Sequence, residues 1–199
     1  GFAMRTKTNT FKVVMTAMMI CLIMVAILFI RVPIPFTQGY VHFGDAMVFL
    51  AVLVLGWKYG AVAAALGGML GDIVGGAAAW APWSLGIKGI MALILGGIIA
   101  MFAKKGTFSK GKLLAGEIVG MIAAGAFMVA GYYFAEGIMY GNWISPLLGI
   151  PWNIGQFAVG GVIAVIISQA LCRTPAKSYF AYKADESGQS GHHGKHAVA

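Results

Sequence analysis

The chain has 199 residues, of which 60% are hydrophobic and only 10% charged, and 29 of them are glycine. This composition excludes a soluble globular domain and a disordered chain, and it is typical of a helical protein with several membrane spans. The formal net charge of +8 follows from lysines and arginines gathered at one membrane face, so no nucleic-acid partner is needed to explain it.

Six apolar stretches are each expected to form a membrane helix, and together they define a membrane domain over residues 11–172. All six prolines lie between or beyond these stretches, where a missing backbone N–H does no harm. The fold class expected from the sequence is an all-α membrane protein with six transmembrane helices. The expected spans are 11–30, 42–57, 59–79, 84–102, 113–135 and 152–172.

The stretch 42–79 could form one long helix or two helices joined by a tight turn, and the charges decide between them. With a turn at 56–60, one face of the membrane receives twelve lysines and arginines, four of them in the loop 103–112. The other face receives only Arg31, because Lys88 lies inside a span. Positive residues favour the cytoplasmic face, so the sequence predicts a hairpin and two cytoplasmic termini.

Two segments outside the membrane domain are expected to be cytoplasmic. Residues 1–10 form the first, and the tripeptide before Met4 resembles a cloning remnant. Residues 173–199 form the second, a largely disordered tail, because 185–199 are rich in glycine, serine and histidine. The histidines of this tail could bind a metal weakly, but they are expected to belong to a solvated tail or to a tag.

Single charges lie inside two successive spans, at Asp72 and Lys88. A charge at membrane depth costs at least ~2.5–3.5 kcal/mol on insertion scales, so it usually marks a pathway or a binding site. Small residues recur every four positions beside Asp72, which places this side chain against a neighbouring helix and not toward lipid. Two interpretations stay open: the charges contact a ligand, or they form a structural ion pair.

The sequence contains no motif of a hydrolase or a metalloprotease. Residues 106–112 match the G-x-x-x-x-G-K part of a P-loop, but Leu113 stands where serine or threonine would bind magnesium. If ATP drives the protein, another chain must hydrolyse it. We therefore predict no enzyme activity, no cofactor and no metal site.

Polar and aromatic residues concentrate on the outer side, which holds four of the five tryptophans. An interfacial aromatic belt should appear on both faces, whereas aromatic rings with amides and a few charges suit a flat heteroaromatic ligand. The loop 31–45 is expected to be a lid, stiffened by two prolines and hinged at Gly39. The candidate ligand-binding residues are His42, Asp45, Asp72, Trp80, Trp83, Lys88, Trp152, Asn153 and Gln156.

The stretch 39–46 (GYVHFGDA), with Gly71-Asp72, Trp80-Ala-Pro and Ile87-Lys88-Gly, resembles the substrate-binding S components of energy-coupling factor (ECF) vitamin transporters. The resemblance covers about residues 11–172. It implies a multi-pass cell-membrane protein that captures a B-vitamin or precursor from outside. It also implies docking on a transmembrane coupling protein that carries two cytoplasmic ATPases.

The family docks through an A-x-x-x-A motif in its first helix, and the matching positions here are Ala17 and Cys21. Within the family, the sequence is most similar to members for hydroxymethylpyrimidine or pyridoxine-type compounds. Riboflavin- and thiamine-type members are the alternatives.

Two other classes of function remain. A self-sufficient proton-coupled carrier could use Asp45, Asp72 or Glu117 as relay carboxylates, but many such carriers have inverted internal repeats and the sequence shows none. A scaffold without a ligand is the third class. Ligand binding by the purified chain, without a partner or a proton gradient, separates the three.

Overall fold

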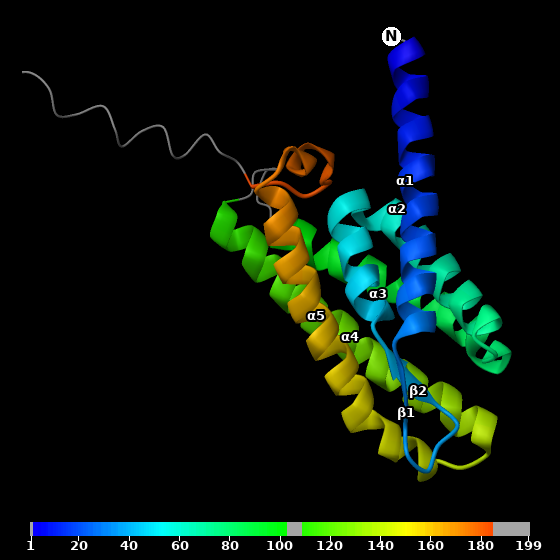
Figure 1. The fold of residues 1–199 in the computed structure, drawn as a ribbon. Helices are drawn as coiled ribbons and strands as arrows, with labels where there is room; N and C mark the ends of the chain where they lie inside the picture. Colours follow the sequence, from blue (N-terminus) through cyan, green and yellow to red (C-terminus); the bar gives the residue numbers. More distant parts are fainter. Residues whose placement is uncertain (1, 103–108, 185–199) are drawn as a thin grey trace, which may run out of the picture.

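The computed structural model describes residues 2–102 and 109–184. This part of the chain contains five helices that are long and apolar enough to cross a membrane. They are α1 (Phe2–Phe29), α2 (Gly44–Val74), α3 (Ala81–Phe102), α4 (Lys110–Tyr140) and α5 (Gly149–Cys172). An antiparallel hairpin of β1 (Arg31–Pro33) and β2 (Tyr40–His42) joins α1 to α2 at one end of the bundle (Figure 1). Short 3₁₀ segments complete the described chain: η1 (Ala78–Trp80), η3 (Ser145–Leu148) and η4 (Pro175–Tyr179).

Helix α2 is broken at Gly56, whose φ of 83° and ψ of 178° are not helical and suit only glycine. A Cβ atom built on Gly60 would lie 2.9 Å from Cα of Val52. Residues eight apart in one straight helix would be separated by ~12 Å. The chain therefore folds back at Gly56 into two arms, 44–55 and 57–74, and the predicted turn is confirmed.

Small residues let the second arm of α2 approach its neighbours closely. A Cβ atom on Gly71 would lie 2.8 Å from Cδ1 of Ile27 in α1. One on Gly68 would lie 2.8 Å from Cγ of Lys88 in α3. The small-residue faces predicted from the sequence are therefore helix contacts, and Asp72 beside them is buried as expected.

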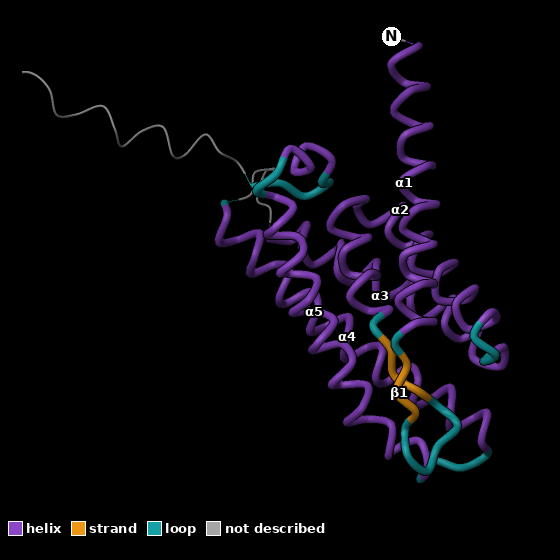
Figure 2. Tube along the Cα trace, viewed as in Figure 1, coloured by secondary structure: helices purple, strands orange, loops and turns teal. Residues whose placement is uncertain are grey.

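The two ends of the bundle differ in chemistry. The hairpin marks one end, and the start of α1 lies at the other, together with the segment that follows α5 (Figures 1 and 2). At that far end, Nζ of Lys12 lies 5.4 Å from the ring centroid of Tyr59, and the rings of Phe11 and Tyr179 stack at 5.2 Å. Lys12 therefore lies at the end of the bundle away from the hairpin.

Residues 173–184 pack on this far end. Phe180 is buried, and the N–H of Ala181 donates to the carbonyl of Val54 at 2.9 Å. The break at Gly56 explains this contact, because the last carbonyls of a helical segment lack partners within it. The stretch 185–199, for which disorder is expected, lies outside the described residues, as do Lys104 and Lys105.

Candidate ligand-binding site

A buried ion pair joins α3 to the first arm of α2. Nζ of Lys88 donates to Oδ1 of Asp45, and the two side chains are only 1% and 0% exposed. Nε2 of Gln156, from α5, donates to Oδ2 of the same carboxylate at 2.9 Å. This pair corrects the hypothesis that Lys88 pairs with Asp72. The fold-back at Gly56 brings Asp45 to the level of Lys88, which a straight helix would not do.

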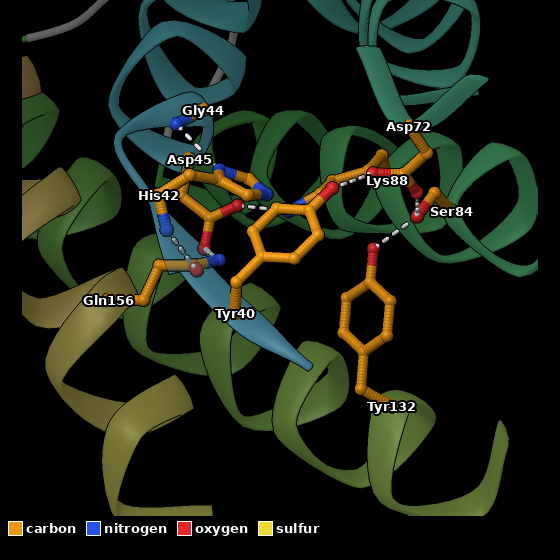
Figure 3. Close-up of polar contacts among 9 residues, drawn as sticks. All are labelled: Tyr40, His42, Gly44, Asp45, Asp72, Ser84, Lys88, Tyr132 and Gln156. Atoms are coloured by element: carbon orange, nitrogen blue, oxygen red, sulfur yellow. Dashed lines mark hydrogen bonds and ion pairs between the residues drawn. The ribbon is translucent and has the colours of Figure 1, made fainter. Parts of the chain in front are cut away.

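Asp72 is held instead by a chain of hydroxyl groups (Figure 3). The hydroxyl of Tyr40 donates to Oδ1 at 2.7 Å, and the hydroxyl of Ser84 donates to Oδ2. Since the Ser84 proton is used in this way, the hydroxyl of Tyr132 donates to Ser84 Oγ, at 2.7 Å. Both carboxylate oxygens of Asp72 are therefore occupied.

The β-hairpin is fastened over this network at three points. Nη1 of Arg31 donates to the carbonyl of Gly75 at 2.8 Å, and the guanidinium carbon lies 3.9 Å from the ring centroid of Tyr40. Tyr40 holds Asp72, and the backbone N–H of His42 donates to Oε1 of Gln156 at 2.9 Å. The hairpin thus connects α2 and α5 across the end of the bundle.

Gly39, the expected hinge, allows the hairpin backbone to lie close to Glu136 of α4. Its φ is not positive, so no unusual backbone conformation requires glycine here. A Cβ atom at this position would lie 3.0 Å from Oε1 of Glu136. The lack of a side chain lets the hairpin tip reach α4.

His42 is half-buried beside the ion pair. Its Nδ1 accepts a hydrogen bond from the N–H of Gly44 at 2.9 Å. Burial, and secondarily the positive charge of Lys88, lower the pKa of His42 to about 3. His42 is therefore neutral at physiological pH and can keep Nδ1 as an acceptor.

A cavity of about 30 Å³ lies beneath the hairpin. This volume holds one or two water molecules. Its walls carry the carboxyls of Asp72 and Glu136, the rings of Tyr40, Trp80 and Tyr132, and the amides of Asn153 and Gln156. Aromatic rings, amides and carboxyls around one cavity are the groups that stack against and hydrogen-bond a flat heteroaromatic molecule.

The cavity contains five of the nine candidate residues: His42, Asp72, Trp80, Asn153 and Gln156. Asp45 and Lys88 form the ion pair behind its wall. Trp83 packs on the hydrophobic core, and Trp152 is 40% exposed and lines an apolar groove of about 400 Å³ between the hairpin and α5. The sequence predicts the depth of these tryptophans in the membrane, but it does not predict the direction in which each side chain points from its helix.

Four other side chains of the site were absent from the candidate set: Tyr40, Ser84, Tyr132 and Glu136. Because residues four apart lie on one helix face, a spacing of four from the candidate Lys88 could have found Ser84, whereas the same spacing relates Tyr132 and Glu136 only to each other. Ser84 precedes Lys88 by four positions, and Tyr132 precedes Glu136 by four. Tyr40, Ser84 and Tyr132 carry no charge, so nothing else in the sequence distinguishes them as site residues.

The family model of the S component of ECF-type riboflavin transporters matches residues 7–173. The chain belongs to this family. S components are transporter subunits and not enzymes, which agrees with the lack of catalytic motifs.

Two further comparisons identify proteins that are similar to this chain. An uncharacterised protein of Pyrococcus woesei, named for the gap 3′ region, is 36% identical over 117 residues, which are 59% of this chain and 72% of that protein. A solved S component of a bacterial ECF transporter has a TM-score of 0.63 at 20% identity, over 83% of this chain and 97% of that one. At this identity, the second comparison shows a shared fold.

Proposed function

We propose that this S component is the substrate-capture subunit of an ATP-driven vitamin importer. The observation that carries the proposal is the small aromatic and polar cavity under the β-hairpin. Polar side chains are costly to bury, so their concentration around one cavity of a transporter subunit supports a ligand site there.

The proposed orientation is a multi-pass cell-membrane protein with six crossings, both termini cytoplasmic and the cavity facing outside. Its support is the distribution of charge along the bundle. Lys12 and Lys58 lie at the end where α2 turns, and Arg31 lies at the hairpin end. In this proposal the positive-inside tendency makes the first end cytoplasmic, and each of the two arms on either side of Gly56 crosses the membrane, which gives six crossings.

Ligand entry in this proposal requires the hairpin to move. Ligand pockets usually have about 300–1,000 Å³, whereas this cavity has about 30 Å³. Opening would break the contacts of Tyr40 with Asp72 and of the His42 backbone with Gln156. The same contacts would re-form around the ligand and slow its release.

Delivery in this proposal depends on docking to a transmembrane coupling protein with two ATPases. Ala17 and Cys21 of α1 are exposed, on the opposite side from Ile23 and Ile27, which are fully buried. Small residues on an exposed helix face allow another helix to approach closely in lipid. We therefore assign partner docking to this face of α1.

The proposed ligand is a small heteroaromatic B-vitamin or precursor of the hydroxymethylpyrimidine or pyridoxine type. The compact polar cavity supports a small ring with several hydrogen-bonding groups. Riboflavin is the second candidate, and the match over residues 7–173 favours it. Thiamine is the remaining alternative.

The test is binding of these vitamins to the purified chain in detergent, followed by thermal shift and calorimetry. We expect saturable binding of one of them without ATPases and without a proton gradient. Binding that appears only in vesicles with a proton gradient would favour a self-sufficient carrier instead. A chain that binds none of the vitamins would contradict the proposed function.

A further inference from the structure

The wall of the cavity carries acidic groups without a free cation. Asp72 and Glu136 both line it. The two nearest basic side chains are engaged elsewhere: Lys88 with Asp45, and Arg31 with the carbonyl of Gly75. Within residues 9–102 and 109–184, no lysine or arginine lines the cavity, and His42, which does line it, is neutral. The site therefore favours hydrogen-bond donors and disfavours anions.

Most polar groups of the wall already have partners. Asp72 accepts from two hydroxyls, and Gln156 uses its oxygen for the His42 N–H and its nitrogen for Asp45. These residues shape the site, but they have little hydrogen-bonding capacity left for a ligand.

Glu136 and Asn153 are different. Oε1 of Glu136 accepts a hydrogen bond from Nε1 of Trp80 at 3.3 Å, while its Oε2 accepts none from the described residues. Asn153 is only 7% exposed, and its side-chain amide makes no hydrogen bond within the described chain. A Cβ atom on Gly149 would lie 3.6 Å from Oε2 of Glu136 and 3.8 Å from Nδ2 of Asn153. An open acceptor and an open amide are therefore neighbours on one wall.

We infer that Glu136 and Asn153 are the specificity residues of the site and recognise an amino-substituted nitrogen heterocycle in its unphosphorylated form. This inference rests on the proposed function. The Glu136 carboxylate accepts from the exocyclic amino group, and the Asn153 amide donates to the adjacent ring nitrogen. Trp80 fixes the carboxylate and offers a ring that also lines the cavity.

The acidic wall gives the reason for rejecting phosphate esters. A phosphorylated ligand would bring a doubly charged group near two carboxyls, without a free basic side chain to pair with it. Like charges placed side by side in a binding site repel each other and select against the wrong ligand. A vitamin would therefore be captured before phosphorylation, and trapping would fall to a phosphorylating reaction inside the cell.

The test compares three probes that differ in one group: hydroxymethylpyrimidine with its 4-amino group, the analogue with oxygen at that position, and the phosphate ester. Riboflavin is added as a fourth probe. Affinities are measured by calorimetry for the unaltered chain and for Glu136→Gln. Glu117→Gln is the matched control, because Glu117 is also buried in α4 and does not line the cavity.

We expect the amino compound to bind about 10- to 100-fold more tightly than the oxygen analogue, the size expected for one hydrogen bond to a charged group. The phosphate ester should bind more weakly still. Glu136→Gln should reduce the preference for the amino compound about tenfold or more, and Glu117→Gln should leave it unchanged. Because this preference is a ratio within one variant, a partial loss of folded protein does not affect it.

Equal binding of the amino and oxygen compounds, tight binding of the phosphate ester, or tight binding of riboflavin alone would overturn the inference and leave vitamin capture standing. An unchanged preference in Glu136→Gln would also overturn it. Failure of all four probes, with thiamine and pyridoxine also unbound, would contradict the proposed function itself and the inference with it.

Discussion

Lys88 and Asp45, 43 positions apart in the chain, form an ion pair that is almost completely shielded from solvent. The pair joins α3 to the first arm of α2, and Gln156 extends it to α5. The ion pair and Gln156 thus fix α2, α3 and α5 to one another behind the wall of the cavity. This arrangement gives Lys88 a structural role, because its ammonium group is already neutralised.

Replacement of Lys88 by methionine should destabilise the protein strongly, since it leaves the Asp45 carboxylate buried without its cation. Removing one partner of a buried pair costs about 3–5 kcal/mol. The double variant Lys88→Met, Asp45→Asn should recover most of the loss. Thermal unfolding in detergent measures both, and the exposed Lys58→Met is the control. Equal instability of the single and double variants would show that the pair does not carry this role.

Tyr40→Phe should weaken ligand binding about tenfold, mainly through faster dissociation. The change removes the hydroxyl that fastens the hairpin to Asp72, and a hydrogen bond to a charged group is worth about 1.5–3 kcal/mol. Tyr133→Phe is the matched control, because its hydroxyl donates to the carbonyl of Trp143 outside the cavity. Stopped-flow dissociation of a bound vitamin checks the prediction, and equal rates in the two variants would contradict it.

Acid should destabilise the protein through His42. The pKa of this imidazole is about 3 in the folded state and ordinarily about 6.5. Between these values the unfolded state binds one more proton, so stability falls as the pH drops below 6.5. At pH 5 the loss from this group is about 2 kcal/mol. Protonation would also displace the Gly44 N–H from Nδ1.

The measurement is the melting temperature at pH 7 and at pH 5, for the unaltered chain and for His42→Asn. Asparagine can accept the same hydrogen bond from a backbone N–H two residues on. The neighbouring charged groups Asp45, Lys88 and Arg31 remain in both proteins. An equal drop in the two proteins would show that His42 is not the group responsible.

The Gly56 turn and the buried position of Asp72 could be predicted, because each rests on a simple pattern. Charge placement required a turn near Gly56, and glycines at a spacing of four required a packed helix face. The partner of Lys88 could not be predicted. Depth in the membrane places Asp72 and Asp45 equally near Lys88. Only side-chain packing decides that hydroxyl groups bind Asp72 while Lys88 pairs with Asp45.

Rotation about the helix axis explains the other differences. Trp83 and Trp152 were placed in the site by their membrane side, yet they face the core and an outer groove. Ser84 and Tyr132 face the cavity without any charge to mark them. In an apolar helix, the sequence does not show which face a small or aromatic residue occupies, because no polar residues mark one face.

Leucine at both Ala17 and Cys21 should block docking on the coupling protein while leaving vitamin binding intact. Added bulk prevents close helix approach, and these positions lie on the exposed face of α1, far along the helix from the hairpin. The assays are ligand binding to the isolated variant and ATP-dependent uptake with the partner chains present. Normal uptake by the double variant would show that another surface docks.

The most direct measurement of the central claim is an experimental structure of the chain with its vitamin bound. The account predicts ligand density beneath the β-hairpin, in contact with Tyr40, Trp80 and Glu136, in a cavity larger than the present 30 Å³. Density at the opposite end, near Lys12 and the Gly56 turn, would contradict it.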